Sequence, residues 1–267
     1  MSPAARGEPV SDVVVERRGD VEWIRLNRPD RMNAYDSAMA HELQQAIRDA
    51  RDAGVIVITG EGRAFCAGGY LKNLANPDPN ELRSMFFGSL ELFEVIRTSP
   101  RPVIAAVNGA AAGGGNELVV ACDLAIAARS AKLGQTGVRV GSAPVLGGTN
   151  LLAISVGEKR AKEISFMCRR YTAQEAYELG WINAVVDDDK LEDEVTAWAD
   201  ELLDMSPRYL EIAKMSSNVW WNSCRDNYVS GLEMLVQAIG SEDMLEGARA
   251  FVEKRKPDFR KRKGDGA

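Results

Sequence analysis

Short apolar runs alternate with longer segments of helical periodicity along most of the chain. The runs predict strands, and apolar positions three or four residues apart predict helices. The expected strands are residues 13–16 and 21–26 as a hairpin, then 55–59, 103–107, 124–127 and 181–186. The expected helices are residues 36–52, 81–96, 118–122, 157–168, 171–179 and 191–203. Together these elements predict an α/β fold, with Asp36 as the N-cap of the first helix.

The C-terminal part of the chain differs from the rest, because it is almost wholly helical in pattern from Ser206 to Lys256. Proline at position 207 fits the first residue of a helix. Trp220, Trp221 and the apolar residues between 232 and 239 are more apolar than a solvent-facing appendage would tolerate. For the two tryptophans a position that faces the core fits the pattern equally well. We therefore divide the chain into a core of residues 1–205 and a helical region of residues 206–267.

The centre of the chain reads as strand, loop and helix. The strand at 103–107 is followed by Gly113, Gly114 and Gly115, and then by an apolar helical segment at 118–122. Peptide N–H groups at a helix start have no partner within the helix and attract negative charge. The charge could be a phosphate, or a carbonyl oxygen that becomes an oxyanion.

Glu117 lies about one turn inside this helix start. One short element could therefore present both a charge-stabilising N–H and a carboxylate for proton transfer. The alternative is that Glu117 only complements the helix dipole, and the spacing leaves both readings open. The glycines do not form a Walker loop, since no Gly-Lys-Ser/Thr follows, and they lack the spacing of a dinucleotide fingerprint.

Composition limits the class of protein. A chain of 267 residues with 45% hydrophobic and 27% charged residues can form one large core. A net charge of −6 and a pI near 5.1 give no general attraction to nucleic acid or anionic lipid. No apolar run approaches the roughly 18 residues of a membrane span, and residues 1–9 lack the apolar core of a signal peptide. We expect a soluble, cytoplasmic protein.

The cysteines and the histidine do not indicate a metal or redox site. Cys66, Cys122, Cys168 and Cys224 are widely spread and form no CxxC pair, so we expect reduced and mostly buried thiols. His41 falls in an apparently amphipathic helix with no partners for a catalytic triad, and a surface position is expected.

Two motifs carry a resemblance to a known family. The segment from Asn108, Asn-Gly-Ala-Ala-Ala-Gly-Gly-Gly-Asn-Glu-Leu, and the segment from Arg63, Arg-Ala-Phe-Cys-Ala-Gly-Gly, resemble the enoyl-CoA hydratase/isomerase (crotonase) superfamily. The resemblance extends from Asn27 to Lys256. It implies a spiral of ββα units, followed from Ser206 by a helical oligomerisation region that packs between subunits of a homotrimer or homohexamer.

The resemblance also implies a reaction. The N–H groups of Gly69 and Gly114 would hold the thioester oxygen of an acyl-CoA, and Glu117 would move a proton or activate water. Coenzyme A would be part of the substrate, with no permanently bound cofactor and no metal.

Further residues are expected to bind the substrate by the same resemblance. Arg31 and Met32 lie in the loop that follows the adenosine part of coenzyme A, and Phe251 and Lys254 lie where a neighbouring subunit's tail touches it. Composition alone would equally fit an ordinary loop and a basic tail. The other expected substrate contacts are Ala67, Tyr70, Leu71, Gln135, Gly137 and Pro144. A loop at residues 73–80, rich in proline and asparagine, is expected to cover the acyl pocket.

Departures from the hydratase pattern keep the reaction open. Gly137 stands where hydratases carry a second glutamate, and Tyr70-Leu71 resembles the 4-chlorobenzoyl-CoA dehalogenase branch. Gln135-Thr136-Gly137 resembles 1,4-dihydroxy-2-naphthoyl-CoA synthase, while Ser142-Ala143-Pro144 resembles 6-oxocyclohex-1-ene-1-carbonyl-CoA hydrolase. Hydration of a 2-enoyl-CoA is the leading interpretation. The alternatives are opening or closure of a carbon ring on a CoA thioester, and a non-catalytic acyl-CoA-binding homologue.

Overall fold

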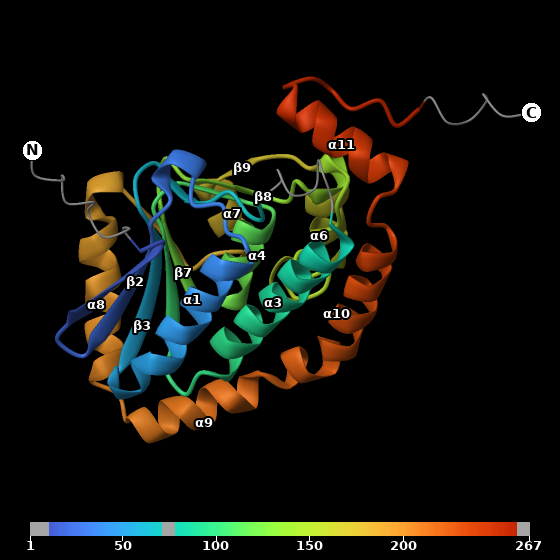
Figure 1. Cartoon of the computed structure of the whole chain (residues 1–267). Coiled ribbons are helices and arrows are strands. Elements are labelled where there is room, and N and C mark those ends of the chain that lie inside the picture. The colour runs from blue at the N-terminus through green and yellow to red at the C-terminus, as the bar shows by residue number, and fades with distance from the viewer. Residues whose placement is uncertain (1–10, 71–77, 261–267) are drawn as a thin grey trace, which may run out of the picture.

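A computed structural model of the chain describes residues 11–70 and 78–260 (Figure 1). Within these residues the larger sheet has six strands in the order β1-β2-β3-β5-β7-β10. They are β1 (Val13–Arg18), β2 (Val21–Leu26), β3 (Val55–Gly60), β5 (Val103–Val107), β7 (Leu124–Ala128) and β10 (Ala184–Val186). Strands β1 and β2 pair antiparallel, which confirms the predicted hairpin, and the other neighbours pair in parallel.

A smaller sheet lies beside the first and holds four strands of the described part of the chain, in the order β4-β6-β8-β9. They are β4 (Ala64–Cys66), β6 (Ala110–Ala112), β8 (Lys132–Gly134) and β9 (Tyr171–Thr172). Strands β4, β6 and β8 each follow a long strand of the larger sheet and pair in parallel. This repeat of a long strand, a short strand and, after β6, the helix α4 (Gly114–Ala121) confirms the predicted α/β spiral.

The centre of the larger sheet is buried on both faces, because β3 and β5 are buried at every position. On one face Ile56 and Ile58 pack in the main core with α1 (Ser37–Asp49) and α3 (Pro79–Thr98). On the other face Val55 and Val57 pack against α8 (Leu191–Leu203). Figure 1 shows this layering, with α1 and α3 in front of the sheet and α8 at its side.

The remaining helices connect the strands or follow the sheets. The connecting helices are α5 (Leu152–Val156), α6 (Glu158–Met167) and α7 (Ala173–Glu178), and the 3-10 helices are Pro29–Arg31, Ala50–Asp52, Gly137–Val140 and Asp188–Lys190. Asp36 caps α1 as predicted, since its side chain accepts a hydrogen bond from the Met39 N–H at 3.1 Å.

Helix α7 and strand β10 begin later in the structure than predicted. Helix α7 begins at Ala173 instead of Tyr171, because Tyr171 and Thr172 pair with β8 and the Thr172 side chain then caps the helix with Glu175. The strand predicted at 181–186 begins only at Ala184. Trp181 leaves the sheet and buries its ring in the core, 5.8 Å from the ring of Tyr171.

Three helices form the C-terminal region: α9 (Pro207–Ser217), α10 (Val219–Gln237) and α11 (Glu242–Val252). Helix α10 covers α3 of its own chain, and buries Trp221, Tyr228 and Leu232 in the main core. An ion pair between Arg83 and Glu233, 3.1 Å long, joins the two helices. Trp221 therefore faces the core. The side chain of Trp220 is not among those that the structure describes.

The predictions for cysteine and histidine are confirmed. All four cysteines are free, and Cys66, Cys122 and Cys168 are buried. His41 is exposed on α1. None of the helices in residues 11–70 and 78–260 is long and apolar enough to cross a membrane.

Candidate active site

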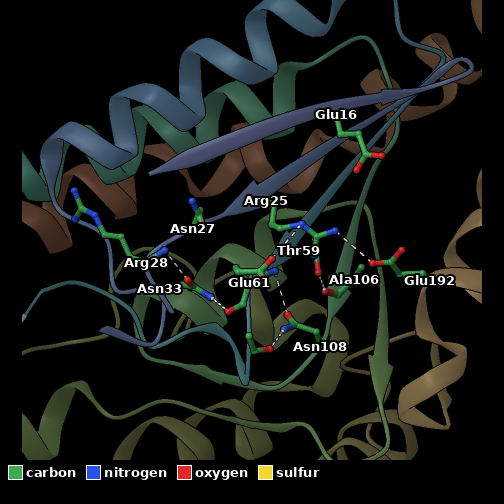
Figure 2. Close-up of polar contacts among 12 residues, drawn as sticks. Glu16, Arg25, Asn27, Arg28, Asn33, Thr59, Glu61, Ala106, Asn108 and Glu192 are labelled. Carbon is green, nitrogen blue, oxygen red and sulfur yellow. Dashed lines mark hydrogen bonds and ion pairs between the residues drawn. The ribbon is translucent and has the colours of Figure 1, made fainter. Parts of the chain in front are cut away.

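Two asparagine side chains fix the loops that lead to the site (Figure 2). Asn33 accepts a hydrogen bond from the Arg28 N–H at 2.9 Å and donates to the Ala64 carbonyl at 2.8 Å. Asn108 accepts from the Gly60 N–H at 3.1 Å, and its amide nitrogen donates back into the loop after β3. Because these bonds tie the ends of β3 and β5 together, the segments that follow the two strands lie side by side.

The glycine run lets the start of α4 press against the segment that follows β4. A Cβ atom on Gly115 would lie 2.0 Å from the carbonyl oxygen of Cys66, a distance that no side chain tolerates. Gly113 has a φ of 55°, which favours glycine. Both positions therefore require glycine, and this close approach brings the first turn of α4 to Gly69.

The two predicted oxyanion donors lie next to each other. A Cβ atom on Gly114 would stand 3.4 Å from the Gly69 nitrogen and 2.6 Å from the hydroxyl oxygen of Tyr35. Gly114 is the first residue of α4, so its N–H has no acceptor within the helix. Tyr35 bridges to Gly69 through backbone pairing and is itself buried. The Gly69 and Gly114 nitrogens and the Tyr35 hydroxyl oxygen thus lie close together at the start of α4.

Glu117 presents its carboxylate to the same place from the first turn of α4. Its Oε1 accepts hydrogen bonds from the N–H groups of Leu146, at 2.9 Å, and Gly148, at 3.2 Å. Burial raises the pKa of this carboxyl from 4.5 to about 7, although the two N–H donors lower it. Since both bonds fall on Oε1, Oε2 is the oxygen that can exchange a proton with a bound molecule.

The raised pKa of Glu117 predicts a dependence of folding stability on pH. Between pH 4.5 and about 7 the folded chain holds a proton that the unfolded chain releases, so the free energy of unfolding should fall as pH rises. The shift corresponds to about 3 kcal/mol over the whole range. We expect Glu117→Gln to remove this slope.

Urea unfolding of both proteins at pH 5 and pH 8, at one protein concentration, measures the difference. An equal stability gap between the two proteins at both pH values would show that Glu117 titrates at its ordinary pKa.

One cavity of about 80 Å³ collects most of the predicted residues. From the loop after β4 and the start of α4 it is lined by Ala67, Gly69, Tyr70, Gly114 and Glu117. From the segment after β8 it is lined by Gln135, Gly137 and Pro144. Gly137 brings no side chain, so among the described residues that line the cavity Glu117 is the sole carboxylate.

The residues predicted to follow the adenosine part of coenzyme A lie beside this cavity. The Arg31 guanidinium stands over the Tyr70 ring, 4.8 Å from its centroid. Met32 adopts a left-handed φ of 52°, and its carbonyl accepts a hydrogen bond from the Ala67 N–H at 2.9 Å. The loop at 27–34 is thereby attached to the wall of the cavity, with an exposed cation at its edge.

Other predicted contacts do not reach the cavity of their own chain. Phe251 is 54% exposed on α11, and Lys254 follows that helix with a φ of 54°. Leu71 and most of the loop predicted at 73–80 lie outside the described residues, and the described end of that loop begins α3 with Pro79.

Several residues of the site were missed by sequence reasoning. Tyr35, which precedes α1, lines the cavity with Ser89 of α3 and Leu235 of α10. The Leu146 backbone holds Glu117. The Ser89 hydroxyl interacts with that of Tyr35, whose pKa is raised above its ordinary value by burial. The sequence signal that could have indicated Ser89 is its position as a polar residue within a predicted apolar helix face.

A known protein family matches most of the chain. The family model for enoyl-CoA hydratase/isomerase matches residues 16–262. The chain therefore belongs to the enoyl-CoA hydratase/isomerase family.

Three solved structures illustrate the likeness. An enoyl-CoA hydratase from Bacillus anthracis is 34% identical, with a TM-score of 0.76 over 93% of this chain and 98% of that chain. Carnitinyl-CoA hydratase from Mycobacterium avium is 31% identical, with a TM-score of 0.83 over 94% and 99%. An enoyl-CoA hydratase from Mycobacterium avium subsp. paratuberculosis K-10 is 27% identical, with a TM-score of 0.84 over 91% and 100%.

Proposed function

We propose that this chain hydrates a 2-enoyl-CoA through a thioester enolate. The observation that supports the proposal is that Gly69, Gly114 and Glu117 line one cavity, with the two glycines close together. Donors placed where negative charge develops stabilise the transition state more than the ground state. A buried carboxyl with a pKa of about 7 can both accept and return a proton near neutral pH.

The reaction then needs one proton-transfer group. Glu117 Oε2 takes a proton from water while the water oxygen bonds to the β-carbon of the substrate. The π electrons move onto the thioester oxygen, where the Gly69 and Gly114 N–H groups hold the enolate. Glu117 then returns the proton to the α-carbon, so that it leaves the cycle ionised as it entered.

A second candidate is the opening or closure of a carbon ring on a CoA thioester. Gly137 favours it, because the cavity has no second carboxylate there to help bind and activate water. An enolate held by the same two N–H groups can also form or release a carbon–carbon bond.

One experiment separates the two candidates. The pure protein is incubated with crotonyl-CoA, with a cyclic 2-oxoacyl-CoA and with succinylbenzoyl-CoA, and the products are followed by mass. Addition of one water to crotonyl-CoA supports hydration. Turnover of the cyclic or the succinylbenzoyl substrate alone supports the second candidate, and turnover of none contradicts both.

We also propose that coenzyme A binds along Arg31 and Met32, and that Phe251 and Lys254 reach it from a neighbouring copy of the chain. Their exposure, away from the cavity of their own chain, supports this arrangement. Residues 206–267 would then form the oligomerisation region of a homotrimer or homohexamer. Tyr209 and Ile212 of α9 and Val219 of α10, 72%, 48% and 54% exposed, provide apolar surface for such contacts.

The oligomer can be weighed directly. Light scattering after gel filtration should give three or six times the 29.1 kDa of one chain. We expect Tyr209→Glu to lower that mass by placing a charge in the contact, whereas Val15→Glu, at an exposed residue of β1, should leave it unchanged. A monomeric wild-type protein at micromolar concentration would contradict the proposal.

A further inference from the structure

The side chain of Gln135 is fully buried, yet its amide has no partner. Both Oε1 and Nε2 lack a hydrogen bond within the described part of the chain, although Gln135 is 0% exposed. A buried polar atom left in this state is destabilising, because it has lost its hydrogen bonds to water and gained none in the protein. Gln135 also lines the cavity that holds Glu117, whereas the other buried side chains with an unpartnered atom, Arg97, Asn116, Trp181 and Tyr228, do not line it. The unpartnered amide is therefore available to a molecule in the cavity.

Gly148 is close to both this amide and the candidate proton-transfer group. A Cβ atom on Gly148 would stand 2.5 Å from Gln135 Nε2, so only glycine lets the amide approach so closely. The N–H of the same Gly148 donates to Glu117 Oε1 at 3.2 Å. The amide and the carboxylate thus adjoin the same residue, and Gln135 and Glu117 line one cavity.

The chemistry of the amide selects its partner. Oε1 needs a donor and Nε2 needs an acceptor, so the partner must both give and accept a hydrogen bond. A ketone or thioester oxygen would satisfy Nε2 alone. A water molecule or a hydroxyl group satisfies both atoms.

We infer that the Gln135 amide holds the water that Glu117 deprotonates in the forward reaction, and the β-hydroxyl of the product in the reverse reaction. This inference rests on the proposed hydration. The water gives its proton to Glu117 Oε2 and its oxygen bonds to the β-carbon, while Gln135 neither gains nor loses a proton. Gln135 is therefore a positioning residue, and its amide supplies the polar contact that a side chain at Gly137 does not.

Gln135→Met tests the inference, because methionine keeps the length of the side chain and removes both polar atoms. Two rates are measured on the same protein. The first is hydration of crotonyl-CoA, and the second is exchange of the α-protons of butanoyl-CoA in D2O. Exchange uses Glu117 and the oxyanion donors but no water nucleophile. We expect hydration to fall about 10-fold to 100-fold, the cost of a misplaced reactant, while exchange stays within about 2-fold of wild type.

A matched control is available in α1. Gln44 is also buried, 3% exposed, but its Nε2 donates to the Gly88 carbonyl at 2.9 Å, away from the cavity. Gln44→Met should lower the free energy of unfolding without changing the ratio of hydration to exchange. A change in the ratio of hydration to exchange that occurs in Gln135→Met alone is therefore specific to the amide of Gln135.

The outcomes separate the inference from the proposed function. Equal losses of hydration and exchange in Gln135→Met, or no loss of either, would overturn the inference and leave the hydratase proposal standing. Absence of both hydration and exchange in the wild-type protein would overturn the hydratase proposal itself.

Should Gln135→Met fail to fold, a crystal structure of the wild-type protein with butanoyl-CoA decides. A water within hydrogen-bond distance of both the Gln135 amide and Glu117 supports the inference, and any other partner for the amide overturns it.

Discussion

Glu117→Gln is expected to lower the rate of hydration by about 10²-fold to 10⁴-fold, the contribution typical of a positioned acid/base group. Glutamine has the same shape, and its amide oxygen can still accept the hydrogen bonds that Leu146 and Gly148 donate to Oε1. The fold should therefore persist. What is lost is the ability to take a proton from water and to return it to the α-carbon.

The measurement is kcat with crotonyl-CoA, together with the α-proton exchange of butanoyl-CoA and the affinity for free coenzyme A. Exchange should fall with hydration, because both use the same carboxylate, while the affinity should stay unchanged. Glu61→Gln, a surface carboxylate that pairs with Arg25 at 3.5 Å, serves as the control. A Glu117→Gln protein that turns over normally would leave Glu117 as a residue that only complements the helix dipole.

Long elements could be predicted because their pattern is local. Residues 191–203 repeat apolar positions at helical spacing over three turns, and α8 has these bounds. The strand at 103–107 was equally clear, because five consecutive apolar residues are bounded by Pro102 and Asn108. In both cases the apolar residues themselves indicate which positions are buried.

The smaller sheet could not be predicted from residues. Strands β4, β6 and β8 have three residues each and β9 has two, which is too short to show a period of two. Their pairing depends on backbone groups contributed by segments distant in sequence. Ala110–Ala112 accordingly looked like part of a loop, and the spiral was expected only through the family resemblance.

Some residues of the candidate site could likewise be predicted from local sequence, and others could not. Gly69, Gly114 and Glu117 were found because motifs surround them in sequence, and their proximity in the structure depends on the glycine at 115. Tyr35 was not found, since its neighbours in sequence describe a capped helix start. Its hydroxyl reaches Gly114 only because the loop at 27–34 is tied to β4. The orphaned amide of Gln135 likewise depends on packing that no local pattern contains.

Gly114→Val is expected to lower the rate by about 10²-fold to 10³-fold, the cost of losing one oxyanion donor, while the affinity for free coenzyme A stays nearly unchanged. The first side-chain carbon alone would lie 2.6 Å from the Tyr35 hydroxyl and 3.4 Å from the Gly69 nitrogen. It would occupy the point on which the donors converge and push the thioester off the helix start. The nucleotide of coenzyme A is expected to bind at Arg31, away from this point.

A second glycine provides the control for adding a β-branched side chain within a helix. A Cβ atom on Gly88 of α3 meets nothing within 4 Å, so Gly88→Val should change stability little and leave turnover intact. Circular dichroism checks the folding of both variants, and kcat is compared with the dissociation constant of coenzyme A. The split between a large loss of rate and a small loss of affinity is the signature of a donor that acts on the enolate. If a folded Gly114→Val protein loses rate and coenzyme A affinity in proportion, the start of α4 binds the nucleotide and the assignment of the oxyanion donors is wrong.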